Sequence, residues 1–455
     1  MKISLDKVLI GVVPAEEIVS DLKDLVCSGL SVDSRTCEPG NLYFAVAGER
    51  ADGHDYIQNA FENGAVAVVV EKDTTHPDHP IFKVENSLKA LGKCGANIRN
   101  SMENCKFIAV TGSCGKTSTK EILGTVFSSV GTAFSTKGNL NNHIGVPLTL
   151  GQHSGDEKFS VIEMGMNHFE EIDYLATIVR PYGAIITSIC PVHLEGVGTL
   201  DGVREAKSEV IDHILPGGFV CIPAGESYLR KKALENKLRI LTFGEKDADF
   251  TVSDCFVSLN KTDFILNYPS GRLNVSIPLP GKHQALNTAA ALAAAYATEI
   301  EIDSLIQSLE KTVLPGSRSS VENHCGITVF NDCYNSSPDS MRNVCEMVEG
   351  LRGYLNTHFL LGDMLELGSE SEKLHILVGE YVRKCNPETV TWVGKMGYAF
   401  QNGLGMDAFL TEDLYEAAEN VVKNLSSGDL LVIKGSRGIN LDAAYNTVVK
   451  KLGEK

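Results

Sequence analysis

At 455 residues the chain is too long for one ordinary core, and typical domain sizes predict about three domains. The net charge of −17 and the lack of any Lys/Arg block argue against a nucleic-acid partner, which requires a cationic surface. No apolar run approaches the roughly 20 residues that cross a bilayer, and the N-terminus lacks the apolar core of a secretory signal. We therefore expect a cytoplasmic protein without membrane insertion.

The first block of the chain, residues 1–100, contains short β-rich runs bounded by Gly, Asn and Asp, among them "NLYFAVAG" and "GAVAVVVE". The polar stretch "NIRNSMENC" (97–105) separates this block from the strand that follows. We therefore predict a small first domain over 1–100.

The second block, residues 101–315, alternates helix-like runs with the strand-like runs "FIAV", "FSVIEMG", "GAIITSI" and "GFVCIPA". This alternation is typical of an α/β domain in which helices cover a parallel sheet. The pattern becomes more β-like between 240 and 280, and an Ala-rich helix is predicted over 284–298. Pro, Gly and Ser in "LPGSRSS" (314–320) mark the end of the block.

The third block, residues 316–455, alternates again. The strand-like runs "ITVFND", "THFLLGD", "TVTWVG" and "DLLVIKGSRG" are separated by helices that begin near 338 and 370. This pattern predicts a second, smaller doubly wound domain of the Rossmann-like kind. The chain as a whole is therefore predicted to be an α/β protein of three domains.

A phosphate-binding loop stands out in "FIAVTGSCGKTSTKEIL" (107–123), between a strand over 107–110 and a helix over 116–130. Glycines allow a tight turn that aims backbone N–H groups at phosphates, while Lys116 reaches the terminal phosphates and Thr117 ligates magnesium. Two residues separate the glycines where the standard pattern has four. An ordinary strand-to-helix turn does not explain the Lys and Thr after the second glycine. The residues predicted to hold nucleotide are Thr111, Gly112, Ser113, Cys114, Gly115, Lys116, Thr117 and Ser118.

Three further residues of the second block can have either a functional or a purely structural role. Glu163 ends a strand-like run, where a carboxylate can hold magnesium, although a surface or capping role is the more common one for a glutamate taken alone. His193 follows another strand and has a structural alternative. Lys207 lies in a helix-like run, and a protonated lysine is a poor magnesium ligand, so its alternative is a plain cation near phosphate.

Several motifs, in order along nearly the whole chain, resemble the ATP-dependent Mur ligases of peptidoglycan synthesis. They are the two-residue-spaced phosphate loop, "SVDSRTCEPGNLYFAVAGERADGHDYI", "KGNLNNHIGVPLTL", "EMGMNH", "HLEG…AK", "GKHQALN", "NDCYNSSPDSM", "LGDMLELG" and "VIKGSRG". The segment "YNSSPDSM" matches the dipeptide-adding branch, whereas the branch that adds the third residue normally carries Asp-Asn-Pro-Arg in its last domain.

The resemblance implies a reaction. ATP would phosphorylate the terminal carboxylate of UDP-N-acetylmuramoyl-tripeptide, and the amine of D-alanyl-D-alanine would attack the acyl phosphate, giving an amide, ADP and phosphate. It also implies a uridine-nucleotide site in the first domain, two Mg²⁺ ions and hinge closure of the outer domains. A monomer is expected.

The resemblance also implies roles for individual residues. Lys116, Asn142, His193 and Lys207 are the expected catalytic residues, and Lys207 matches a position that the family carbamylates. The expected metal ligands are Thr117, Glu163, His193 and carbamylated Lys207. Further nucleotide contacts are expected from Asn287, Arg318 and Asp332. The expected substrate contacts are Ser31, Asp33, Ser34, Arg35, Gly48, Asp52, Gly53, His54, Asn335, Lys434, Ser436 and Arg437.

Two positions depart from the family pattern. Cys114 stands where the family usually carries Asn, and a thiol beside a helix N-terminus and Lys116 is expected to be reactive, so ATP should protect it from alkylation. His143 stands where relatives commonly carry an acid or amide. None of the twelve cysteines forms a C-x-x-C pair, so we expect reduced, mostly buried thiols.

Three other functions compete with this interpretation. A third-residue-adding Mur ligase is the nearest, and folylpolyglutamate synthase shares the ATPase core but lacks a comparable first domain. A binding module that hydrolyses ATP only to change partners is a third possibility. Release of ADP that depends on both substrates would separate the ligase from that switch.

Overall fold

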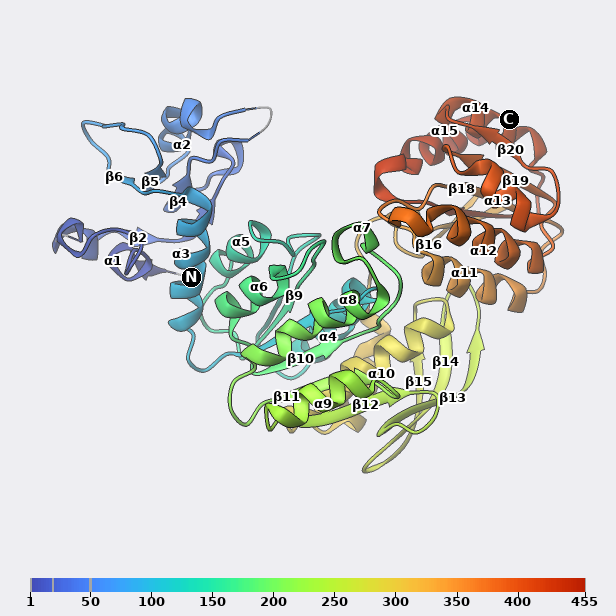
Figure 1. Cartoon of the computed structure of the whole chain (residues 1–455), viewed down its shortest axis with the longest axis horizontal. Coiled ribbons are helices and arrows are strands. Elements are labelled where there is room, and N and C mark those ends of the chain that lie inside the picture. Colours follow the sequence, from blue (N-terminus) through green and yellow to red (C-terminus); the bar gives the residue numbers. More distant parts are fainter. Residues whose placement is uncertain (1, 19, 49–50, 455) are drawn as a thin grey trace.

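The computed structural model describes residues 2–18, 20–48 and 51–454. Figure 1 shows three bodies in chain order: a first domain in blue, a central domain from cyan to yellow, and a third domain in orange and red. Each body is built on its own sheet, which agrees with the predicted three-domain α/β architecture. The predicted limits near 100 and 315 fall in the connections between these sheets, because α3 ends at Asn100 and β16 begins at Ser320.

The first domain contains a four-stranded parallel sheet in the order β3-β4-β5-β6 and an antiparallel pair, β1 and β2. Helix α3 joins it to the central domain, where the Arg99 guanidinium donates to the carbonyls of Val179 and Arg180 at 2.5 and 2.7 Å. The strands are β1 (Ile3–Ser4), β2 (Val26–Cys27), β3 (Gly29–Ser31), β4 (Asn41–Phe44), β5 (Ala67–Val70) and β6 (Ile81–Lys83). The helices are α1 (Leu5–Val8), α2 (Ile57–Glu62) and α3 (Ser87–Asn100).

The central domain contains a nine-stranded sheet in the order β15-β14-β13-β12-β11-β10-β7-β9-β8. Strands β7 to β13 all pair in parallel. Strands β14 and β15 extend the sheet in antiparallel pairing, within the segment 240–280 that was predicted to be more β-like. The strands are β7 (Lys106–Thr111), β8 (Ala133–Ser135), β9 (Phe159–Glu163), β10 (Gly183–Ile186), β11 (Phe219–Pro223), β12 (Arg239–Gly244), β13 (Phe250–Val257), β14 (Thr262–Tyr268) and β15 (Gly271–Ile277).

Helices cover both faces of this sheet. Helix α4 and the Ala-rich α10 pack on one face, and α6 and α8 contribute to the core on the other. Most residues of α10 are buried, because alanine lets neighbouring backbones approach closely. The helices are α4 (Lys116–Ser128), α5 (Gly145–Gly151), α6 (Glu171–Val179), α7 (Leu194–Val197), α8 (Leu200–Ser208), α9 (Ser227–Glu235) and α10 (Lys282–Ala297).

The third domain contains a six-stranded sheet in the order β16-β17-β21-β18-β19-β20, parallel except for β16. The strands are β16 (Ser320–His324), β17 (Ile327–Asn331), β18 (Thr357–Gly362), β19 (Thr389–Val393), β20 (Phe409–Thr411) and β21 (Leu430–Lys434). The helices are α11 (Pro338–Gly350), α12 (Ser371–Lys384), α13 (Gly397–Leu404), α14 (Leu414–Asn424) and α15 (Leu441–Gly453). This is the doubly wound arrangement predicted for the third block.

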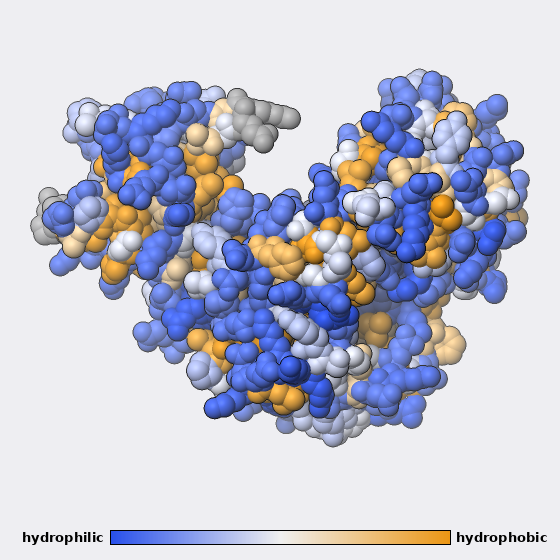
Figure 2. All heavy atoms as spheres, in the orientation of Figure 1, coloured by the Kyte–Doolittle hydropathy of each residue, from blue (hydrophilic) through white to orange (hydrophobic). Residues whose placement is uncertain are grey.

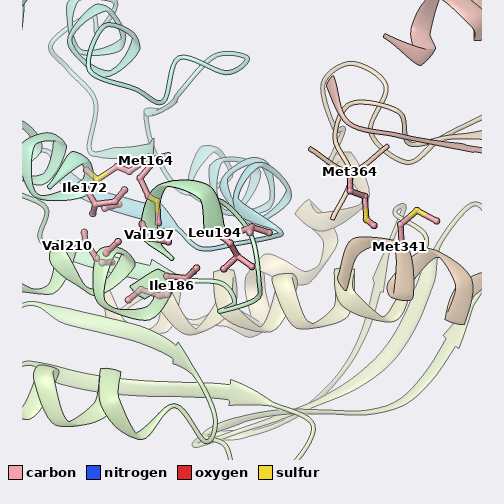
Figure 3. Packing of buried hydrophobic residues seen from close by; sticks show 14 of the residues in the cluster. Met164, Ile172, Ile186, Leu194, Val197, Val210, Met341 and Met364 are labelled. Carbon is pink, nitrogen blue, oxygen red and sulfur yellow. The ribbon is translucent and has the colours of Figure 1, made fainter. Parts of the chain in front are cut away.

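The central and third domains share buried apolar contacts. Figure 3 shows one hydrophobic cluster that reaches from Met164 and Leu194 of the central domain to Met341 and Met364 of the third. Figure 2 shows the surface hollowed between the first and third domains. Within the described part of the chain, no helix has both the length and the apolar character needed to cross a membrane.

Candidate active site

A crevice of about 880 Å³ lies between the central and third domains. Its walls come from the segments that follow the carboxyl ends of β7, β9 and β10 on one side and of β17, β18 and β21 on the other. Ligands of parallel α/β sheets bind at this edge, where successive loops converge. The crevice therefore has the position expected of an active site shared by two domains.

The phosphate loop joins β7 to α4 with two glycines in left-handed backbone conformations. The φ angles of Gly112 and Gly115 are 140° and 83°, which side chains disfavour. A Cβ on Gly115 would stand 2.4 Å from Asn287 Oδ1, so the loop packs directly on α10. Lys116 Nζ donates to Gly112 O at 2.7 Å and to Ser113 O at 3.1 Å, which holds its charge at the mouth of the loop.

Hydrogen bonds attach the same loop to the segment after β10. Ser113 N donates to Ser188 O, and Cys114 N donates to Ser188 Oγ, both at 2.9 Å. Thr111 and Thr117 are buried at the two ends of the loop, and Ser118 is buried in the first turn of α4. The eight loop residues among the eleven predicted nucleotide contacts thus form one short segment that is held by several hydrogen bonds.

Glu163 ends β9 in a buried position with half of its carboxylate bonded. Oε1 accepts from Asn141 Nδ2 at 2.8 Å, while Oε2 has no hydrogen-bond partner among the described residues. Burying an ionised oxygen without a partner is costly, so this atom fits a site that receives a cation. Asn142, the residue predicted from the motif, lines the crevice but uses its Oδ1 to accept from Gly145 N at 2.8 Å, at the start of α5.

Lys207 lies on α8 with its side chain fully buried. Its Nζ has no hydrogen-bond partner among the described residues. Burial, together with the nearby charge of Lys116, lowers the pKa of Lys207 well below its ordinary value. Burial therefore disfavours the charged form of this amine, which speaks against the alternative of a plain cation.

His193 connects the two walls of the crevice. Burial, followed by the charge of Lys116, lowers the pKa of His193 to about 3, so the ring is neutral at pH 7. Its Nδ1 lies 2.6 Å from Glu366 Oε2 of the third domain. A carboxylate can only accept, so Nδ1 carries the proton and Nε2 is left with the lone pair that a metal requires.

The third domain presents cations to the crevice. The guanidinium carbons of Arg318 and Arg437 lie 3.4 and 5.3 Å from the ring centroid of Tyr334. Lys434 Nζ is buried and bonds to Asp332 Oδ2 at 2.6 Å and to Asn335 O at 2.9 Å. Ser436 Oγ accepts from Leu365 N at 3.0 Å. The predicted third-domain residues are therefore gathered at one end of its sheet.

The first-domain candidates lie away from this crevice, following the carboxyl ends of β3 and β4. Asp33 and Arg35 form an exposed ion pair at 2.7 Å, close to Ser31 and Ser34 in sequence. Gly48 and the "DGHD" segment (52–55) follow β4. The His54 ring is already bonded on both sides, to Asp52 Oδ1 at 2.6 Å and from Glu71 N at 3.0 Å, which gives it a structural role. A Cβ on Gly53 would meet Val46 N at 2.7 Å.

Four residues that were not predicted from the sequence stand out, three that line the crevice and Cys190 beside the phosphate loop. Asn141 bonds Glu163, and Glu366 bonds His193. His283 lies beside the crevice with Nδ1 buried and unbonded among the described residues, and burial lowers its pKa to about 4. Cys190 meets Cys114. The motifs that contain Asn141, His283 and Glu366 were recognised, but contacts between distant segments carry no local signal.

Sequence profiles of three consecutive domains match the chain. They are the Mur ligase middle domain (residues 110–295), the Mur ligase family catalytic domain (26–97) and the Mur ligase glutamate ligase domain (318–437). The Escherichia coli UDP-N-acetylmuramoyl-tripeptide–D-alanyl-D-alanine ligase is 32% identical over 442 residues, 95% of each chain.

Solved structures agree with these matches. MurF from Acinetobacter baumannii superposes with a TM-score of 0.89 at 28% identity over 99% of both chains. Thermotoga maritima MurF in complex with ADP gives a TM-score of 0.83 at 27% identity, covering 94% of this chain and 98% of that one. A 2,6-diaminopimelate ligase reaches only 0.53 at 18% identity, a likeness of fold alone. The chain belongs to the Mur ligase family.

Proposed function

We propose that this chain joins D-alanyl-D-alanine to UDP-N-acetylmuramoyl-tripeptide at the expense of ATP, as its relatives are named to do. The observation that carries the proposal is the crevice itself. It unites a phosphate loop, a carboxylate oxygen that is buried without a partner among the described residues, and the cationic end of a second sheet. The buried amine of Lys207 lies close enough to Lys116 for that charge to lower its pKa.

The reaction requires activation because a carboxylate is a poor electrophile until one oxygen becomes a good leaving group. Transfer of the γ-phosphoryl group to the tripeptide carboxylate gives an acyl phosphate, which the dipeptide amine attacks to form a tetrahedral intermediate. Lys116 and the N-terminus of α4 favour negative charge on the transferring group. Arg318 and Arg437, held beside Tyr334, place positive charge on the opposite wall.

The residues present fit two Mg²⁺ ions. Glu163 Oε2 and the Thr117 hydroxyl suit one ion, and the free Nε2 of His193 suits the other. The described residues hold no cluster of three His, Cys, Asp or Glu side chains. Mg²⁺ usually takes one or two protein ligands together with waters and substrate phosphates. When bound, the ions would neutralise charge on the phosphates.

We also propose that Lys207 is carbamylated. A neutral amine adds to carbon dioxide with loss of one proton, and the resulting carbamate is an anionic oxygen ligand. The support is the buried Nζ, which has no partner among the described residues and whose lowered pKa disfavours an ammonium. Carbon-13 bicarbonate should give a carbamate resonance with the native chain and none with Lys207→Met.

The test of the main proposal is release of ADP by the purified chain with ATP, Mg²⁺ and UDP-N-acetylmuramoyl-tripeptide, with and without D-alanyl-D-alanine. Turnover that requires both peptides supports the ligase. Release indifferent to both supports instead an ATP-driven switch. We further propose a monomer in the cytoplasm, where both nucleotide substrates are found; light scattering of the purified chain checks the monomer.

A further inference from the structure

Two cysteines far apart in the sequence meet at the phosphate loop. Cys114 lies in the loop between β7 and α4, and Cys190 lies in the segment after β10. Both backbones are fixed, because Cys190 N donates to Ser113 Oγ at 2.9 Å and Ser113 Oγ donates to Cys190 O at 3.1 Å. These bonds bring the Cys190 side chain beside that of Cys114.

The pair is also accessible and reactive. Both side chains are only partly buried, and Cys114 lines the crevice, so a small solute can reach it. Hydrogen bonds from Cys190 and Ser337 and the charge of Lys116 lower the pKa of the Cys114 thiol, although burial opposes this shift. A thiolate beside a second thiol is the arrangement found in redox-sensitive cysteines.

We propose that Cys114 and Cys190 form a disulfide when a hydroperoxide reaches the crevice, and that this modification prevents ATP binding. The Cys114 sulfur attacks the peroxide, the O–O bond breaks, and a sulfenic acid forms with release of water or an alcohol. The Cys190 sulfur then attacks the sulfenic sulfur, the S–S bond forms, the S–O bond breaks and water leaves. Two electrons and two protons pass from the thiols to the peroxide.

The crosslink acts on ATP binding through the loop. It joins the loop that surrounds the phosphates to the segment that leads to His193, so neither can adjust to a ligand independently. It also draws the Cys114 sulfur away from Ser337 Oγ, now 3.2 Å away at the start of α11. This effect on turnover rests on the proposed function, whereas the crosslink and its effect on ATP binding do not.

A second thiol pair provides an internal control. Cys385 Sγ donates to Cys345 O at 3.5 Å, but Cys345 is buried on α11, away from the crevice. Variant Cys385→Ser should therefore respond to peroxide like the native chain. Variant Cys190→Ser keeps the backbone bonds to Ser113 and should bind ATP normally before oxidation.

The experiment treats the full chain with hydrogen peroxide, digests it with trypsin without reduction and identifies the peptides by mass. Peptides 107–116 and 159–204 each contain one cysteine, so the crosslink joins two defined fragments. We expect this joined species, loss of ATP binding in proportion to it, and recovery with dithiothreitol. Cys190→Ser should show neither the crosslink nor the reversible loss, and Cys190→Ala replaces it if the serine variant misfolds by circular dichroism.

Separate peptides after oxidation would overturn the proposal, as would a crosslinked chain that binds ATP with unchanged affinity. A crosslink confined to Cys345 and Cys385 would also overturn it. If the crosslink forms and blocks ATP binding but the chain shows no ligation, the inference stands and the proposed function fails.

Discussion

At the scale of single residues, Glu163 has a buried carboxylate oxygen that no described residue bonds. We predict that Glu163→Gln lowers kcat/KM at least about 100-fold, roughly 3 kcal/mol of transition-state stabilisation, because an amide cannot offer a charged oxygen to a cation. Steady-state ADP release at several Mg²⁺ concentrations measures it. Glu171→Gln is the control, since that carboxylate lines the same crevice but already accepts from Asn167 N at 2.7 Å. An equal loss in both variants would contradict a special role for Glu163.

Lys207 is a second residue whose burial is explained by function rather than stability. Its lowered pKa means that, between the folded and unfolded pKa values, the unfolded chain binds a proton that the folded chain does not. Stability of the native chain should therefore rise with pH toward the unfolded pKa near 10.4. We predict that Lys207→Met abolishes ligation yet raises the apparent melting temperature in buffer free of carbon dioxide, by about 2–4 °C per kcal/mol gained.

The advantage of Lys207→Met should shrink as pH rises from 7 to 10, and thermal unfolding across that range checks it. Lys120→Met is the matched control. Lys120 is equally buried, but its Nζ bonds Thr136 O at 2.6 Å and Glu121 at 2.7 Å, so its loss should destabilise the chain at every pH. A destabilised Lys207→Met would show that the buried amine contributes to the fold.

Cys114 gives a prediction that depends on pH. Its thiol pKa is lowered, to about 6, by the hydrogen bond from Cys190 first, with contributions from Ser337 and Lys116. Alkylation of Cys114 should be fast at pH 7 and should slow as pH falls below about 6. ATP should protect the thiol, and Cys190→Ser should slow the reaction at pH 7. Mass-resolved labelling of peptide 107–116 measures all three, and equal labelling with and without ATP would contradict the protection.

At the scale of elements, the turn between β7 and α4 depends on Gly115. We predict that Gly115→Ala weakens ATP binding and lowers stability by about 1–2 kcal/mol or more, because φ is 83° and the new Cβ would meet Asn287 Oδ1 at 2.4 Å. Gly138→Ala tests the effect of the positive φ angle alone, since the φ angle of Gly138 is 59° but nothing lies within 4 Å of the new Cβ. Calorimetry with ADP and thermal unfolding measure both. Equal effects would mean that the contact with α10 is unimportant.

Helices and strands were largely predictable where the spacing of apolar residues and the positions of glycines indicated the same element. The helix predicted over 116–130 is α4, two residues shorter, and the Ala-rich helix predicted over 284–298 is α10, Lys282–Ala297. The first block was described by its strands, but α3 is its longest element. The alternation of strands and helices could be read from the sequence because the inner strands β7, β9, β10 and β11 are almost fully buried and form short apolar runs. The pairing order of the nine strands depends on long-range contacts.

At the scale of the whole molecule, the candidate substrate residues of the first domain lie outside the crevice that contains the phosphate loop. We therefore predict closure of the outer domains, seen as a smaller radius of gyration by X-ray scattering with a non-hydrolysable ATP analogue and UDP-N-acetylmuramoyl-tripeptide. A rigid crosslink that holds the outer domains apart should abolish ligation and leave ATP binding. Unchanged turnover in the crosslinked chain would contradict closure.

Contacts between domains explain why some residues of the site could not be predicted from the sequence. Lys116, Thr117 and Glu163 carry local signals, because each follows or ends a strand in a recognisable order. Glu366 acquires its importance only because the third domain docks against α7, where His193 lies 2.6 Å from it. Contacts that exist only between folded domains leave no period or spacing in the chain.

Helix α10 has one more consequence. Alanine side chains have no rotamers, so the middle of this helix cannot change shape without moving its backbone. The N-terminal end of this helix, which carries His283, Gln284 and Asn287, therefore has a rigid backbone. A nucleotide that reaches this end of the crevice therefore meets side chains whose positions are already fixed. A nucleotide base of the wrong shape cannot be accommodated by a movement of this helix.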